Sequence, residues 1–142
     1  MFSKEASRQI KQEFWTSFGK SFPRKWILYN TKIKGLAFKF YFDTKKAFIC
    51  LDLEDDLENR INCWEKLLAL KTILTSEFLS DVIFEEAFFL ENGKEISRIY
   101  VPLEQNVSIH NKNTWQQTME FFNEKMLLFE TFFEEYKDII KG

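Results

Sequence analysis

The segment spanning residues 36–53 constrains the fold more than any other part of the chain. Large apolar residues recur at every second position on both sides of a short polar stretch, which is typical of two β-strands joined by a tight turn. A turn at Thr44 and Lys45 pairs the two halves as antiparallel strands, with Phe42 opposite Ala47. One face of this hairpin is then entirely apolar and needs a covering layer, whereas the other face is only half polar.

A second hairpin is expected around Asn92-Gly93, a dipeptide typical of two-residue hairpin turns. A two-residue loop there places Glu85 opposite Tyr100 and diagonal to Arg98. These three side chains are candidates for lining a pocket that binds a small polar ligand, because convergent polar groups on an apolar surface are typical of pockets. Cross-strand ion pairing within the sheet is the alternative explanation, and it requires no ligand.

Helices are expected over residues 3–18, 55–78 and 114–140, each with a polar residue suited to its N-terminus and apolar residues at helical spacing. The last helix begins with a Thr-x-x-Gln capping box. Residues 26–33 have strand-forming side chains and are expected to add a strand before the first hairpin. The order α-β-β-β-α-β-β-α predicts one α+β domain over residues 1–142, an antiparallel sheet of about five strands with three helices packed on it.

Charge is distributed unevenly along the chain. Residues 1–46 carry a net charge of +8, although the whole chain carries −2. A basic face of this kind can contact the phosphates of a nucleic acid, and the candidates for that contact are Arg24, Lys25, Lys32 and Lys34. No signature of a nucleic-acid-binding module accompanies them. The alternatives are a solvated face and an acidic protein partner.

Residues that usually carry catalysis are sparse. His110 is the only histidine, so a metal site built on paired imidazoles is excluded and any Ser–His or Cys–His dyad depends on this one residue. Cys50 and Cys63 lack the close spacing of metal or redox motifs and are interpreted as reduced, small apolar residues. The chain contains 4 glycines, too few and too dispersed for a phosphate-binding glycine loop. No catalytic residue, metal or cofactor is predicted.

Asp52 and Glu54 form the acidic pattern closest to a metal site for phosphodiester cleavage. A nuclease of the restriction-endonuclease type combines such residues with Asp/Glu-x-Lys on the neighbouring strand. Here the sequence continues with Asp55 and Asp56, and a match at residues 43–45 falls in the predicted turn. The acidic run is already explained by the favourable interaction of carboxylates with the N-terminus of the next helix.

The N-terminal residues and the hydropathy pattern of the chain lead to an expectation about its localisation. The first residues lack the apolar stretch of a secretory signal, and no segment reaches the ~18 apolar residues of a membrane span. We therefore expect a cytoplasmic protein that does not engage a membrane.

The last predicted helix has an apolar surface wider than one sheet face requires. Beside its main apolar stripe runs a second row, which consists of Phe121, Leu128, Phe132 and Ile139. Packing against the other helices of the same chain would cover this row. The alternative is a homodimer in which two copies pair these rows across a two-fold axis.

Four segments together resemble an uncharacterised bacterial family, the domain of unknown function 4268, in a form common among Bacteroidetes. They are "EFWTSFGKSFPRKWILYNTKIKG", "FKFYFDTKKA", "LENGKEISRIYV" and "SIHNKNTWQQTMEFFNEKM". Some larger members of that family carry the domain beside a restriction-endonuclease-like nuclease domain, so the resemblance implies a binding or accessory role in DNA-related processes. It brings no catalytic residues to this chain.

The sequence therefore predicts a non-enzymatic binding domain that engages a protein partner or a second copy of itself. The alternative is a nucleic-acid-associated accessory domain, or a degenerate relative of the restriction-endonuclease-like nucleases, that uses the basic residues 20–46.

Overall fold

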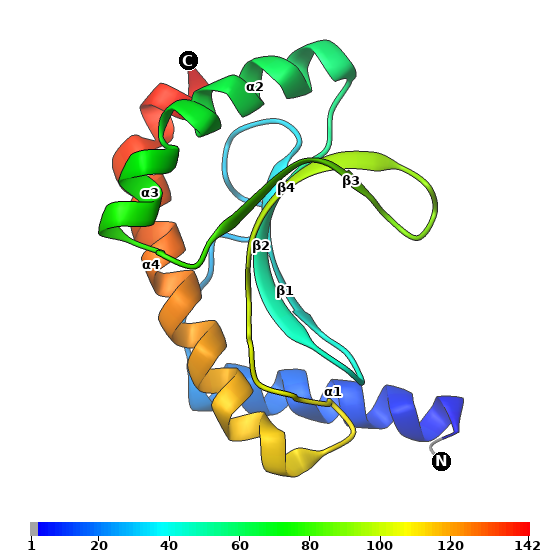
Figure 1. Ribbon diagram of the computed structural model, residues 1–142. Helices are drawn as coiled ribbons and strands as arrows, with labels where there is room; N and C mark the ends of the chain where they lie inside the picture. Colours follow the sequence, from blue (N-terminus) through cyan, green and yellow to red (C-terminus); the bar gives the residue numbers. More distant parts are fainter. Residues whose placement is uncertain (1–2) are drawn as a thin grey trace.

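The computed structural model describes residues 3–142, which form one four-stranded antiparallel sheet with the strand order β1-β2-β4-β3 and α-helices packed against it (Figure 1). This architecture confirms the predicted α+β class, with four strands rather than about five and four α-helices rather than three. The elements are α1 (Lys4–Ser21), β1 (Leu36–Phe42), β2 (Ala47–Leu53), α2 (Leu57–Ala69), α3 (Lys71–Glu77), β3 (Ile83–Phe89), β4 (Glu95–Pro102), a 3-10 turn (Lys112–Thr114) and α4 (Trp115–Lys141).

The first hairpin has the predicted register. β1 pairs with β2 from Leu36 opposite Leu53 to Phe42 opposite Ala47. The side chain of Asp43 stabilises the connection, because its Oδ1 accepts hydrogen bonds from the backbone N–H groups that follow. A clear period of two on both strands and a short loop leave little freedom in how these strands pair.

The second hairpin forms where predicted, but the predicted register is wrong. Gly93 has a φ of +85° in a three-residue loop closed by a hydrogen bond from Leu90 N to Lys94 O, and a bulge between Glu85 and Phe88 shifts the pairing again. Three-residue loops with glycine in the left-handed conformation are the next most common hairpin connection after two-residue loops. As a consequence Glu85 lies opposite Arg98 rather than opposite Tyr100.

Residues 26–33 do not form the predicted strand. Leu28 and Lys32 have positive φ angles of 46° and 65°, which interrupt an extended conformation. The loop instead runs along β1, where Leu28 O accepts a hydrogen bond from Phe38 N. Gly35 ends the loop at a φ of +79°, and a Cβ there would collide with the backbone carbonyl of Glu54.

The helices differ from the predicted boundaries in three places. α1 continues through Gly19 to Ser21, although its cap is as predicted, with Ser3 Oγ accepting from Ala6 N. The long helix expected from Asp55 breaks at Leu70 (ψ 2°), which separates α2 from α3. The predicted capping box of α4 does not form, because Thr114 is in a helical conformation and its hydroxyl binds the backbone of the preceding loop.

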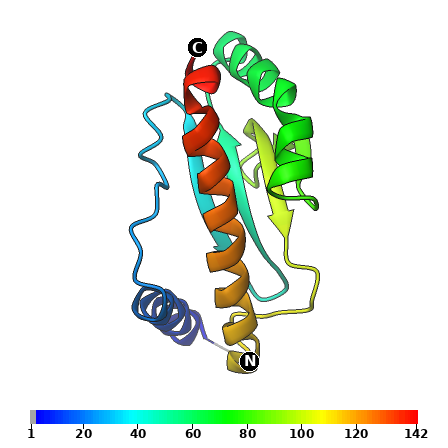
Figure 2. The same cartoon turned by 90° about the vertical axis from the view of Figure 1, so that its left-hand side faces the viewer.

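One face of the sheet is covered by helices and contains the main core. α4 lies lengthwise over this face, α2 and α3 lie beside α4, and α1 crosses one end of the sheet (Figures 1 and 2). Aromatic contacts connect these layers: the Phe38 ring lies 5.2 Å from that of Phe129 on α4, and the Phe14 ring of α1 lies 6.1 Å from that of Phe122. The high aromatic content of the sequence thus fills the layer between sheet and helices.

The second apolar row of α4 is used mainly inside the chain. Phe121 and Phe132 are buried, Leu128 is partly buried against the core, and Ile139 is 55% exposed. The Phe132 ring contacts Phe78 beside α3 at 5.6 Å. Intramolecular packing therefore covers most of the row, and the homodimer stays a prediction about solution behaviour. Within residues 3–142, no helix combines the length and the apolar character needed to cross a membrane.

Candidate binding site on the uncovered face of the sheet

None of the helices formed by residues 3–142 lies over the second face of the sheet (Figure 1), yet several of its side chains are buried. Phe48, Cys50 and Asp52 point to this face from β2 and are 9%, 1% and 1% exposed. In Figure 1 the hairpin of β3 and β4 arches over the same side, away from the helices. The strong twist that a β-bulge introduces explains this arch.

A buried ion pair lies at the centre of this face. Arg98 on β4 is directly opposite Asp52 on β2, and its guanidinium donates through Nε to Oδ1 at 2.7 Å and through Nη2 to Oδ2 at 2.9 Å. Arg98 is only 8% exposed. Burial alone would lower the pKa of Arg98, but the hydrogen bonds to Asp52 and the nearby charges of Asp52 and Glu85 together outweigh it, and the pKa is raised. The guanidinium is therefore held in a single charged state and orientation.

Two aromatic rings fix the guanidinium from its sides. The Cζ atom of Arg98 lies 4.1 Å from the ring centre of Phe88 and 5.1 Å from that of Phe48. The Phe48 ring is in turn stacked on Tyr41 with ring centres 4.6 Å apart. Cation–π contacts of this kind strengthen when the site is desolvated. The bulge places Phe88 over Arg98, and no sequence pattern pointed to this contact.

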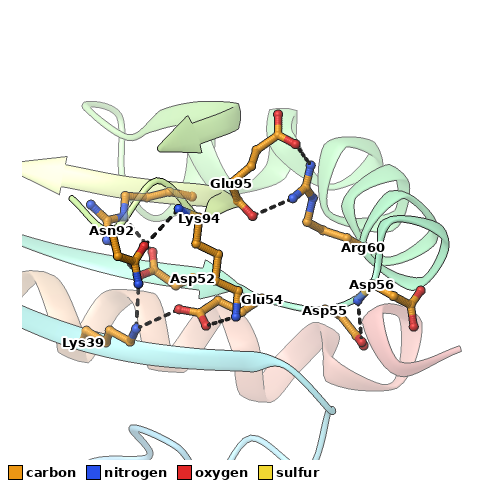
Figure 3. A network of polar contacts seen from close by, with 10 residues as sticks. Lys39, Asp52, Glu54, Asp55, Asp56, Arg60, Asn92, Lys94 and Glu95 are labelled. Atoms are coloured by element: carbon orange, nitrogen blue, oxygen red, sulfur yellow. Dashed lines mark hydrogen bonds and ion pairs between the residues drawn. The ribbon is translucent and has the colours of Figure 1, made fainter. Parts of the chain in front are cut away.

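The ion pair extends along the face into a network of alternating charges (Figure 3). Lys39 Nζ lies 3.4 Å from Asp52 Oδ2 and 3.6 Å from Glu54 Oε1, and Lys94 Nζ lies 3.1 Å from Glu54 Oε2. A lysine from the neighbouring strand β1 therefore accompanies the Asp52/Glu54 pair, although it is not part of an Asp/Glu-x-Lys pattern. However, Arg98 and Lys39 already bind both oxygens of Asp52, and residues 3–142 contain no group of three potential metal ligands.

The three residues predicted to line a ligand pocket do lie together, in a different arrangement. The Tyr100 hydroxyl donates to Glu85 Oε1 at 2.8 Å, although Tyr100 is paired with Ile83 across the hairpin. Partial burial and this bond raise the pKa of Tyr100, so the phenol stays protonated. Glu85 also lies opposite Arg98 in the register. Within this group the cross-strand contact is the Tyr100–Glu85 hydrogen bond, whereas the ion pair of Arg98 is with Asp52 on β2.

A cavity of about 340 Å³ opens next to this pair, between the first hairpin and the arching β3–β4 hairpin. Arg98 and Tyr100 line it, whereas Glu85 does not. Its volume is within the range of about 300–1,000 Å³ that is typical of ligand sites. The wall is mainly aromatic and aliphatic, and the remaining lining residues are Tyr41, Lys46, Ala47, Phe48, Phe88, Phe89, Leu90, Glu91, Pro102 and Leu103. We call this space the aromatic cavity. Phe89 at its rim is 65% exposed.

The four basic residues predicted to contact nucleic acid are divided between two places. Arg24 binds Glu130 on α4 at 3.3 Å, and Lys25 lies in a depression beside Glu134 and other acidic residues of that helix. Lys32 and Lys34 instead line a groove of about 660 Å³ next to the charge network. The same groove contains Lys39 and Tyr29, which is 75% exposed.

The remaining candidates for a catalytic role are His110, Cys50 and Cys63. His110 Nε2 lies 3.1 Å from Ser7 Oγ on α1. Cys50 and Cys63 are free thiols on β2 and α2. Burial raises the pKa of both, so neither is an activated nucleophile.

A scan against protein-family models matches residues 10–137 to the domain of unknown function DUF4268. The match covers most of the chain, so the protein belongs to this family, as the four sequence segments indicated. The searches of curated proteins and of solved structures give no match.

Proposed function

We propose that this member of the DUF4268 family is a non-catalytic binding domain that engages a protein partner through the uncovered face of its sheet. The observation that carries the proposal is the aromatic cavity on a face that none of the described helices covers, with the exposed Phe89 among its lining residues. Aromatic side chains concentrated around a pocket are typical of the centres of protein interfaces. The rigid ion pair of Arg98 and Asp52 beneath the cavity holds its floor in place.

The proposal includes the absence of catalysis, which is supported by the surroundings of the individual residues that could have been reactive. Asp52 is bound by two cations, and the thiols of Cys50 and Cys63 have raised pKa values. Each of these arrangements removes a reactive group rather than activating one.

Selection of peptides from a random library tests the proposal. Phe89→Ser removes an exposed aromatic side chain of the cavity, and Ile139→Ser is the matched control because it removes an exposed apolar side chain from α4 on the other side of the sheet. Both substitutions are at exposed positions and are expected to leave the fold intact. Peptides retained by the wild type should bind the Ile139 variant equally and the Phe89 variant at least about 10-fold more weakly. The proposal is wrong if the Phe89 and Ile139 variants bind every selected peptide alike.

Nucleic-acid binding is a second candidate function, and the groove beside Lys32 and Lys34 favours it. An exposed tyrosine beside lysines is a combination that suits a single strand, in which a base stacks on the ring and the lysines contact phosphates. Lys32→Glu combined with Lys34→Glu should then abolish the shift of a single-stranded oligonucleotide at low salt, whereas Lys25→Glu should not. No shift with the wild type at low salt excludes this candidate.

A further inference from the structure

Arg98 lines the aromatic cavity and has one guanidinium nitrogen that no hydrogen bond among the described residues uses. Arg98 donates hydrogen bonds to Asp52 through Nε and Nη2, and none of the hydrogen bonds among residues 3–142 involves its Nη1. No buried side-chain nitrogen or oxygen in these residues lacks a partner. Nη1 therefore keeps contact with solvent, and Arg98 lines the aromatic cavity although its side chain is only 10% exposed.

The surroundings of Nη1 favour an anion that is attached to an apolar group. The guanidinium is positioned by Asp52 and by the rings of Phe48 and Phe88, so binding an acceptor requires little further ordering. Lys46 adds a second cation to the lining, against one carboxylate, that of Glu91. A guanidinium nitrogen in a partly desolvated site forms its strongest hydrogen bonds with carboxylates and phosphates.

The geometry of a peptide limits where such a carboxylate can come from. Adjacent side chains of an extended chain point to opposite sides, and two side chains on the same side belong to residues about 6.6 Å apart. An internal Asp or Glu therefore enters a pocket together with an apolar side chain only across that spacing. At the C-terminal residue, however, the apolar side chain and the carboxylate are attached to the same carbon atom. Both groups can then occupy one cavity of about 340 Å³.

We propose, on the basis of the function proposed above, that the aromatic cavity binds the C-terminal residue of the partner. Its apolar side chain packs among the rings, and its carboxylate accepts a hydrogen bond from Nη1 of Arg98. Lys46 provides additional attraction at the opening. The partner is therefore a protein whose exposed chain end carries a large apolar residue.

A matched pair of probes isolates the carboxylate. Acetyl-Gly-Gly-Phe with a free carboxyl end should bind roughly 10- to 100-fold more tightly than the same peptide with a C-terminal amide, the range expected for one charge-assisted hydrogen bond. Calorimetry or NMR titration measures both affinities. Equal affinities, or no binding of the free acid at millimolar concentration, overturn the inference. The function proposed above remains testable in either case, because internal peptides and the Phe89→Ser variant test it separately.

Variants assign the effect to this cavity. Arg98→Gln combined with Asp52→Asn keeps a neutral hydrogen-bonded pair and should abolish the preference for the free acid over the amide. If that double variant does not fold, Lys46→Gln at an exposed position should reduce the same preference several-fold. An unchanged preference in the folded variant overturns the assignment to Arg98 and Lys46. Tighter binding of 3-phenylpropionate than of the peptide acid would assign the cavity to a small free acid and overturn its assignment to a chain end.

Discussion

The guanidinium of Arg98 and the carboxylate of Asp52 form a bidentate ion pair, with donor–acceptor distances of 2.7 and 2.9 Å, on a sheet face that no helix of residues 3–142 covers. Both residues are more than nine-tenths buried. The cavity wall and the charge network meet at this pair, so its integrity decides the shape of the proposed binding surface.

Breaking this pair should destabilise the protein strongly. Asp52→Ala leaves the charge of Arg98 buried without its partner, which costs about 3–5 kcal/mol when one member of a buried pair is removed. Lys94→Gln is the control, because it removes an exposed ion pair with Glu54 and should cost less than about 1 kcal/mol. Urea denaturation measures both free energies of unfolding. Similar values for the two variants would contradict the role given to the Arg98–Asp52 pair.

The second apolar row of α4 leads to a prediction about folding. Phe132 is 1% exposed and contacts Phe78, so Phe132→Glu should prevent stable folding, since loss of a buried aromatic side chain alone costs about 3–5 kcal/mol. Ile139→Glu at the exposed end of the same row should remain folded. Circular dichroism and light scattering distinguish the outcomes. A wild-type dimer that Phe132→Glu converts into a folded monomer would contradict the intramolecular packing and support the homodimer.

Glu130 should make stability depend on pH. Burial raises the pKa of this carboxyl group, although Ile27 N and Arg24 donate hydrogen bonds to it and oppose the rise. A pKa that is higher in the folded state gives a contribution to stability that is present at low pH and is lost as the pH rises through the raised pKa. Relative to Glu130→Gln, the wild type should therefore lose stability as the pH rises from about the ordinary value of 4.5.

Denaturation of both proteins at a series of pH values tests this sign. Arg24→Gln removes a group that opposes the rise, so it should move the loss of stability to higher pH. The prediction fails if the wild type gains stability relative to Glu130→Gln over this interval.

Tyr41, on the wall of the aromatic cavity, should ionise only at an unusually high pH. Its hydroxyl donates to Asp43 Oδ2 at 2.7 Å, and this bond together with partial burial and the charge of Asp43 raises the pKa of Tyr41 to about 12. Asp43→Asn should bring the pKa back towards the ordinary value of 10.0, while its Oδ1 can still accept from the turn. Ultraviolet titration measures tyrosinate formation, with Tyr41→Phe assigning the signal. If tyrosinate still forms at the same high pH in Asp43→Asn, then Asp43 is not the cause of the raised pKa of Tyr41.

The parts of the fold that were predictable are those in which a regular pattern meets a short connection. The β1–β2 register follows from strict alternation and a short loop. The β3–β4 register does not, because a left-handed Gly93 and a bulge each shift the pairing and neither changes the apolar pattern. Residues 26–33 resemble a strand in composition, but two positive φ angles turn them into a loop. The break at Leu70 involves neither proline nor glycine, so no breaker signal marks it.

The candidate site was predictable only in part, again where regular alternation along the strands determines which side chains share a face. Glu85, Arg98 and Tyr100 were expected on one face and lie there. The contact of Lys39 with Asp52 follows from the confirmed β1–β2 register, in which Lys39 is opposite Cys50 and therefore diagonal to Asp52. The aromatic cavity could not be predicted, because it depends on how far the bulged hairpin bends over the sheet.

The central claim is that the uncovered face of the sheet is the binding surface, and an NMR map of a bound peptide tests it most directly. Backbone amide signals are followed while a peptide selected on the wild type is added. The largest changes should occur at residues lining the aromatic cavity, such as Phe48, Phe89 and Tyr100. Changes centred on α1 and the exposed side of α4, with the cavity residues unaffected, would contradict the claim.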